Sequence, residues 1–435
     1  MYIKTTSVRN QLSGFNLKPD KSSGIFMSIT KESEKASIRH LPTPAFVPYL
    51  TSIMVLLFAM ASALAVANVY FAQPLLDIMA ADLNVNPSAI GLVVTLTQVG
   101  YALGLIFIVP LGDLWDRRKL IIGQLLLSAI VLILASLAPT FSLLLMAMLI
   151  IGLMAVVVQV LVAFAAALAP EQQKGKVVGQ VTSGIVLGIL LARFISGTMA
   201  DFAGWRSVYF CSAAVILLMA VMLYRVMPHA AKSAPSSYRQ LIFSLYELFI
   251  SERELRIRAT LALLIFMAFS VLWTAMVLPL SSPPYALSHS QVGLFGLAGI
   301  AGALAASRAG QLADRGLGRK TTQIALMLLL FSWLPIAFLP HSLWWLVIGV
   351  MILDFAVQAL HVTNQSIILT LRPDAQSRLV AGYMLFYSIG SGIGAISTTW
   401  VYSHAGWSGV CLLGAIISTI AILFLHLTYR KHSTV

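Results

Sequence analysis

Long runs of apolar residues, separated by short polar segments, dominate the chain from about residue 50 to its end. A bilayer core about 30 Å thick requires about 20 apolar residues in a helix, so each run of that length predicts one membrane-spanning helix. Twelve such helices are expected, at approximately 50–76, 88–110, 119–138, 141–168, 177–200, 207–226, 258–280, 291–309, 321–339, 342–370, 379–402 and 409–428.

The composition supports a membrane protein and excludes a large soluble catalytic domain. Apolar residues make up 59% of the chain and charged residues only 10%, whereas soluble domains carry about 25% charged residues. The chain contains no HExxH, GxSxG or Walker sequence, so no enzyme activity, cofactor or metal is expected. Its two cysteines, Cys211 and Cys411, lie in apolar runs and do not form a disulfide framework.

Basic residues gather in alternate loops, and their distribution predicts the orientation in the membrane. The net charge is +13. If the N-terminus is cytoplasmic, every Lys and Arg lies on the cytoplasmic side except Arg206, in an external loop, and Arg193, inside the fifth span. The positive-inside rule therefore predicts an even number of spans with both termini in the cytoplasm. The charge then reflects topology, and nucleic-acid binding is not expected.

Polar segments divide the chain into expected domains. Residues 1–45 predict a disordered cytoplasmic tail, because they lack the apolar core of a signal peptide; whether translation starts at Met1 or Met27 is left open. Residues 227–257 form a cytoplasmic linker, with an amphipathic surface helix expected around Tyr238–Phe249. The linker separates the other domains, which are a six-helix bundle at 46–226, a second bundle at 258–430 and a short cytoplasmic tail at 431–435.

Two short motifs occur once in each half of the chain. The sequence GDLWDRRK begins at Gly112 and GQLADRGLGRK begins at Gly310, an offset of 198 residues. A Gly-Trp pair begins at Gly204 and another at Gly406, an offset of 202 residues. Similar offsets near half the chain length indicate a duplicated six-helix unit, which is a frequent transporter architecture.

These motifs resemble the major facilitator superfamily, whose signature in the first cytoplasmic loop of each half is close to G-x-L-x-D-R-x-G-R-K. The second copy matches it with one inserted residue, and the first copy is shortened. The resemblance covers about 46–430 and implies an all-α membrane protein with 12 transmembrane helices in two pseudo-symmetric six-helix bundles. It also implies a latch between the halves on the cytoplasmic side, at Gly112, Asp116, Arg117, Gly310, Asp314, Arg315 and Arg319; the alternative is simple anchoring by basic side chains.

Ionisable residues inside predicted spans are the main candidates for function, because a charge at the bilayer centre costs about 2.5–3.5 kcal/mol or more. Asp354 lies midway along the tenth span, and Gln358, His361 and Gln365 follow it on the same helical face. The resemblance places the tenth helix on a central cavity. Asp354 and His361 are therefore candidates for proton coupling, because burial and neighbouring groups can bring either one into a useful titration range. A permanent packing network is the alternative.

Arg193 is the second charge inside a predicted span. It is expected either to pair with Asp354 or to bind an anionic part of a substrate. The surrounding segment, GIVLGILLARFISG, resembles the fifth-helix motif of drug/proton antiporters, although Ile189 replaces the motif's proline. Weaker cavity candidates are polar and aromatic residues on other spans: Tyr70, Gln73, Gln98, Tyr101, Gln159 and Trp273.

The expected function is secondary active transport by alternating access, with proton-coupled efflux of small organic molecules preferred. Proton-coupled or facilitative uptake of a small metabolite is the alternative, and a channel or non-transporting receptor belongs to a different class. The expected partners are a small-molecule substrate, protons and the lipid bilayer of a bacterial inner membrane, and the protein is expected to be a monomer. The sequence identifies neither the solute nor the stoichiometry.

Overall fold

The computed structural model describes residues 50–228, 237–299, 309, 312, 316–372 and 375–430. Within these ranges the chain is helical and contains no β-strand. Ten of the described helices are long and apolar enough to cross a membrane. The all-α membrane fold class is therefore confirmed.

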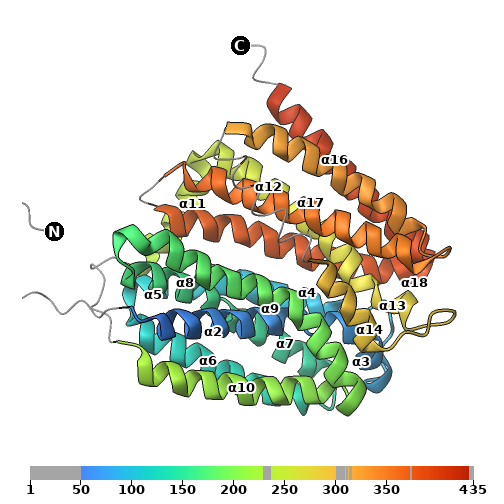
Figure 1. Cartoon of the computed structure of the whole chain (residues 1–435), viewed down its shortest axis with the longest axis horizontal. Coiled ribbons are helices and arrows are strands. Elements are labelled where there is room, and N and C mark those ends of the chain that lie inside the picture. Colours follow the sequence, from blue (N-terminus) through green and yellow to red (C-terminus); the bar gives the residue numbers. More distant parts are fainter. Residues whose placement is uncertain are drawn as a thin grey trace, which may run out of the picture. The chain divides into compact units, whose positions relative to one another are not determined.

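The first half of the described chain, residues 50–226, folds into helices that pack mainly on one another (Figure 1). Helix α2 contacts α9 and α10, α4 contacts α7, and α6 contacts α10. The elements are α2 (Ser52–Tyr70), η2 (Gln73–Leu75), α3 (Leu76–Asp82), α4 (Leu92–Phe107), α5 (Leu111–Leu114), α6 (Arg117–Ser136), α7 (Phe141–Ala155), α8 (Val157–Leu168), η3 (Glu171–Gln173), α9 (Lys174–Ala203) and α10 (Trp205–Val226).

The second half, residues 253–430, contains a corresponding set of helices, in which α12 packs on α18 and α16 packs on α17. A connector helix precedes it, as the amphipathic pattern predicted, and its Tyr238 hydroxyl donates to the Phe107 carbonyl at 2.8 Å. The elements are α11 (Tyr238–Ser251), α12 (Arg253–Ala275), α13 (Val277–Leu280), α14 (His289–Leu294), η4 (Phe295–Gly299), α16 (Gly318–Ala337), α17 (Leu343–Leu369) and α18 (Gln376–Arg430).

The predicted count of twelve spans agrees with these helices. The range of α18 covers both the eleventh and the twelfth predicted spans. The two are separated at Gly406, where the backbone leaves the helical region with φ of 60°. The eighth predicted span, 291–309, begins in α14 and η4, and most of its remainder lies outside the described residues. Gly204, at the corresponding position of the first half, has φ of 76°. Both repeated Gly-Trp pairs therefore lie at corners that need a left-handed backbone, which glycine adopts without steric cost.

Three predicted spans differ in detail from the observed helices. The first is interrupted after Tyr70, where Pro74 follows in a short 3₁₀ turn, and α3 then continues to Asp82. The fourth is divided at Val156, between α7 and α8. The seventh begins at Arg253 rather than at residue 258, which places Arg258 within the second turn of the helix instead of at its first residue.

The two halves meet where α9 contacts α14, α4 contacts α18 and α3 contacts α13. The Thr399 hydroxyl donates to the Ser88 carbonyl at 3.0 Å across this junction. We call this part the His289 end, and the opposite part, which carries Arg117, the Arg117 end. The orientation predicted from the basic residues places the His289 end outside the cell. The division into two independent six-helix domains stays a prediction.

Candidate transport site

A buried arginine stands at the centre of the candidate site. Arg193 of α9 is only 2% exposed, and its Nε donates to Gln73 Oε1 at 2.8 Å. Its guanidinium carbon lies 3.7 Å from the centre of the Trp273 ring, with the rings of Tyr70 at 5.1 Å and Phe269 at 5.5 Å. Aromatic faces attract a cation, and the attraction grows when water is excluded. The first half thus places its intramembrane cation against aromatic side chains of the second half.

Asp354 is the acidic counterpart in the second half. It lies on α17, is 5% exposed, and its Oδ1 accepts a hydrogen bond from Trp273 Nε1 at 3.1 Å. The same indole therefore contacts Arg193 with its face and Asp354 with its N–H. No ion pair within 4.0 Å joins Arg193 to Asp354 in the described part of the chain, so the direct pair considered from the sequence is wrong for this conformation. The two charges attract each other at longer range, with Trp273 linking them.

Two glycines of η4 leave space for these charged side chains. A Cβ on Gly299 would lie 3.1 Å from Asp354 Oδ2, and a Cβ on Gly296 would lie 3.3 Å from the Arg193 Cβ. A cavity of about 10 Å³ borders Arg193, Gln73 and Trp273, which is room for about one water molecule. The Arg193 Nη2 atom is buried and has no hydrogen-bond partner among the described residues. The site is therefore closed in this conformation, and a solute can enter only if the helices around it move.

A tyrosine pair also connects the halves near this site. The hydroxyl groups of Tyr70, on α2, and Tyr387, on α18, form a short hydrogen bond. The ring of Tyr387 packs on Phe266 of α12. The pair Tyr101 and Gln159, in contrast, lies within the first half, where the Gln159 Nε2 atom donates to the Tyr101 hydroxyl at 3.1 Å.

The polar face of α17 reaches two different environments. His361 is separated from Asp354 by two helical turns, and its Nδ1 lies 3.0 Å from the Tyr383 hydroxyl. The side chains of Gln358 and Gln365 are half-buried. Gln98, on α4, is buried, and no described residue bonds to its Oε1. The structure thus gathers Arg193, Gln73, Tyr70, Trp273 and Asp354 into one cluster. His361 has no direct contact with Asp354 and reaches this cluster through Tyr387, whose ring it contacts and whose hydroxyl bonds to Tyr70.

Sequence reasoning missed a buried cation in the second half. Arg258, which the sequence analysis placed at the cytoplasmic start of the seventh span, is 2% exposed within α12. Its Nε donates to Glu254 Oε1 at 2.7 Å, and its Nη1 donates to Thr322 Oγ1 at 3.1 Å and to Asn364 Oδ1 at 3.2 Å. These bonds join α12, α16 and α17. The available signal was the i,i+4 pair of Glu254 and Arg258, which is typical of a continuous helix.

Replacing Arg258 by Met is expected to destabilise the second half by about 3 kcal/mol, because it leaves buried polar partners and the Glu254 carboxylate without their donor. The replacement of Arg253, an exposed arginine on the first turn of the same helix, by Met is the matched control and should change stability little. Thermal unfolding of the two purified variants in detergent measures the difference. Equal stability of the two variants would contradict a stabilising role for Arg258.

Two of the predicted latch residues, Arg117 and Asp116, make their contacts within the first half. Arg117 donates to Asp113 Oδ1 at 3.0 Å, to the Gly112 carbonyl at 2.9 Å and to the Ala163 carbonyl at 3.3 Å. Asp116 instead caps α6 by accepting from the Arg118 backbone N–H at 2.9 Å. Arg319 is exposed near the start of α16. The other predicted latch residues, Gly310, Asp314 and Arg315, lie outside the described residues. The latch role stays a prediction.

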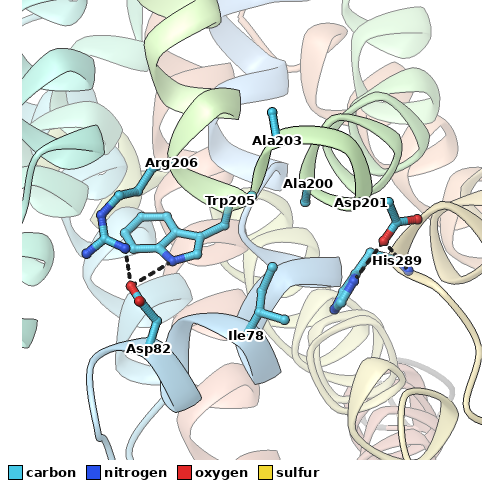
Figure 2. Close-up of a pocket in the computed structure, with 9 residues that line it drawn as sticks. Ile78, Asp82, Ala200, Asp201, Ala203, Trp205, Arg206 and His289 are labelled. Atoms are coloured by element: carbon cyan, nitrogen blue, oxygen red, sulfur yellow. Dashed lines mark hydrogen bonds and ion pairs between the residues drawn. The ribbon is translucent and has the colours of Figure 1, made fainter.

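A larger pocket opens at the His289 end (Figure 2). It has a volume of about 480 Å³, and its lining includes Asp82, Asp201, Trp205, Arg206 and His289. Asp82 accepts a hydrogen bond from Trp205 Nε1 at 3.1 Å and pairs with the Arg206 guanidinium. This pocket contains charged residues that the sequence analysis did not select as candidates, because they lie at helix ends, just outside the predicted spans.

Comparison with known proteins identifies the family. The Major Facilitator Superfamily model matches residues 56–315 and 258–435. The chain therefore belongs to the major facilitator superfamily and is a transporter of that type. The resemblance drawn from the loop motifs is confirmed.

Individual relatives agree with this assignment. YgaY, a putative uncharacterized transporter of Escherichia coli (strain K12), is 44% identical over 86% of this chain and 95% of its own length. A probable transporter of Streptomyces coelicolor is 29% identical over 82% of this chain and 83% of its own. A bacterial homologue of the human lysosomal transporter Spinster, in an inward-facing occupied conformation, has a similar fold, with a TM-score of 0.72 at 14% identity, covering 87% of this chain and 97% of that one.

Proposed function

We propose that this member of the superfamily is a proton-coupled exporter of small organic molecules that works by alternating access. The observation that carries the proposal is the cluster of Arg193, Trp273 and Asp354, which places opposite charges from the two halves on one indole ring. Charged groups inside a membrane protein are costly and usually serve a solute or proton pathway. A titratable carboxyl group at the junction of the halves is suited to such a pathway.

The chemistry of the cluster supports a proton-dependent change in how the halves interact. An ionised Asp354 accepts the Trp273 N–H and attracts Arg193, whereas a protonated Asp354 loses its charge and much of this attraction. Proton binding and release on Asp354 therefore change the strength of the interaction between the first and second halves. Alternating access depends on interactions whose strength changes during the cycle, because each conformation must be favoured in turn.

The side chains around the cluster favour an organic solute with an apolar or aromatic part. Tyr70, Phe269 and Trp273 provide flat apolar surfaces. Gln73 and the Nη2 of Arg193, which has no partner in the described part of the chain, provide polar groups. Binding sites for small molecules commonly combine a mainly apolar lining with a few placed polar groups. We extend the proposal to a monomer in the bacterial inner membrane, with both termini in the cytoplasm.

Export is preferred over uptake because of the family resemblance and the buried charges, although the fifth-helix segment departs from the drug/proton antiporter motif at Ile189. Its Gly184 and Gly188 pack directly on α2, where an added Cβ would lie 2.2 Å from the Ala59 carbonyl oxygen and 2.4 Å from that of Ala63. Such close helix contact is what small residues spaced four apart provide in membranes. Gly184 and Gly188 therefore serve helix packing in this segment.

The test begins with an untargeted comparison of the compounds that accumulate in cells with and without the expressed chain. We expect one or more small organic compounds to decrease in the expressing cells. The flux of each compound is then measured in proteoliposomes with and without a pH gradient, and the gradient should drive transport against the solute gradient. Accumulation in place of depletion would indicate uptake. Flux that is the same with and without the pH gradient, or no flux at all, would contradict proton-coupled transport.

A further inference from the structure

His289, at the start of α14, lies between two carboxylates of the other half. Its Nε2 is 3.1 Å from Asp77 Oδ1, on α3, and its Nδ1 is 3.0 Å from Asp201 Oδ1, on α9. Figure 2 shows Asp201 and His289 facing each other at one edge of the larger pocket. The imidazole belongs to the second half and both acids belong to the first. The three side chains therefore bridge the junction at the His289 end.

Asp201 also binds the backbone of α14. It accepts hydrogen bonds from the backbone N–H of His289 at 3.0 Å and of Ser290 at 2.8 Å, and from the Ser290 hydroxyl. Gly197, one turn earlier on α9, packs so closely that an added Cβ would lie 2.1 Å from the His289 carbonyl oxygen. The contact is thus fixed by the backbones of both helices as well as by side chains.

The positions of the acids identify the protonation state that fits this geometry. A neutral imidazole carries one N–H and donates to only one carboxylate, while its other nitrogen presents a lone pair. A protonated imidazole donates from both nitrogens. Because a carboxylate oxygen faces each nitrogen of His289, the arrangement is complete only when the ring is protonated.

We propose that His289 is a second proton-binding site, and that its protonated form holds the two halves together at the His289 end through Asp77 and Asp201. The site goes beyond the proposed function, in which the proton acts on Asp354. Its ligand is a proton, which can reach His289 through the pocket of about 480 Å³ that the residue lines. The predicted orientation places this pocket outside the cell.

The charges around His289 agree with this assignment. Hydrogen bonding to Asp77, followed by charge attraction to Asp77 and contact with Asp201, raises the pKa of His289 above its ordinary value. Asp82 and Arg206, in the same pocket, pair with each other. Arg193, on α9, directs its guanidinium to Trp273 rather than to His289.

A lower pH favours the closed form of the His289 end. Contact with the acids raises the pKa of His289 in the closed form relative to a form in which the halves are apart, so a proton favours closure. The stabilisation is fully present below the ordinary pKa of histidine, about 6.5, and is lost as the pH rises through the raised pKa. A proton taken up from outside therefore closes that side, which an exporter driven by entering protons requires.

The test measures distance in the full chain, reconstituted in lipid nanodiscs without solute. Cysteines replace Ala81 and His341, exposed residues at the His289 end of the first and second halves, after Cys211 and Cys411 are changed to Ser. Spin labels on the two new cysteines report the separation of the halves. Between pH of about 5.5 and about 8.5, the distances should shift from mostly short to mostly long, because deprotonation of His289 removes its attraction to Asp77 and Asp201.

Two variants of His289 separate the effect of the proton from general loss of structure. His289→Gln should shift the distances toward the separated form and lose the pH dependence, whereas His289→Lys, which keeps a cation, should stay closed throughout. His404→Gln, which changes another exposed histidine, is the control and should keep the wild-type response. A wild-type chain without pH dependence, or a His289→Gln variant that retains it, would overturn the proposal. Because no transport is measured, the outcome is independent of the role of Asp354.

Discussion

Replacing Asp354 by Asn is expected to reduce proton-driven flux to the level of protein-free liposomes while the chain stays folded. Asparagine has nearly the same shape and keeps an oxygen to accept the Trp273 N–H, but it cannot take up and release a proton. The measurement is uphill transport in proteoliposomes under a pH gradient. Exchange of labelled for unlabelled solute, without a gradient, should persist in the same variant.

His361 provides the comparison for this prediction. It shares a helical face with Asp354 but bonds to Tyr383 two turns away, so His361→Gln is expected to keep more of the coupling. Normal uphill transport by the Asp354→Asn variant would remove Asp354 from the proton pathway. If His361→Gln instead abolished coupling, the site would have to be placed around Tyr383.

The replacement of Gly152 by Leu is expected to disrupt the packing of α7 on α4, at a cost of about 3 kcal/mol or more. A Cβ at Gly152 would lie 1.9 Å from the Thr97 carbonyl oxygen, and one at Gly100 would lie 1.9 Å from that of Leu149. The two glycines thus face backbone across the same helix crossing, and backbone cannot move aside as a flexible side chain can. Close helix packing of this kind is a main source of stability within a membrane.

Thermal unfolding measures the effect of Gly152→Leu, with a thiol-reactive dye that detects exposure of the buried Cys411 after Cys211 is changed to Ser. Gly123→Leu is the matched control, because a Cβ at this glycine of α6 meets nothing within 4 Å. We expect the control to unfold near the wild-type temperature. A Gly152 variant as stable as the control would show that the crossing adjusts without cost.

Much of the fold could be predicted because the bilayer restricts what a chain can form. Backbone groups in lipid need internal hydrogen bonds, so each apolar run of sufficient length becomes a helix. The interruptions at Phe71 and Val156 were not predicted, since neighbouring helices can satisfy the backbone at such breaks. Arg258 was expected at the cytoplasmic edge of the seventh span because charged residues usually lie at span ends, whereas partners on other helices satisfy it inside the protein.

The candidate site could be predicted only in part. Asp354 and Arg193 were found because isolated charges in apolar runs are conspicuous, and the structure brings both to Trp273. The indole bridge could not be derived, because it depends on the three-dimensional arrangement of three helices. The cluster of Asp77, Asp201 and His289 was also missed as a unit, since its members are 88 and 212 residues apart in the chain. Their functional roles await the experiments described above.

The binding of Asp201 to the first turn of α14 has a consequence for how the molecule moves. The N–H groups of His289 and Ser290 have their acceptor in the other half, while Ser288 and Gln291 complete a capping box within their own segment. When the halves part, α14 keeps its own capping box but loses the hydrogen bonds to Asp201. Its first residues then become free to unwind. The rate of amide hydrogen exchange at Ser290 should therefore report how often the two halves separate at this end.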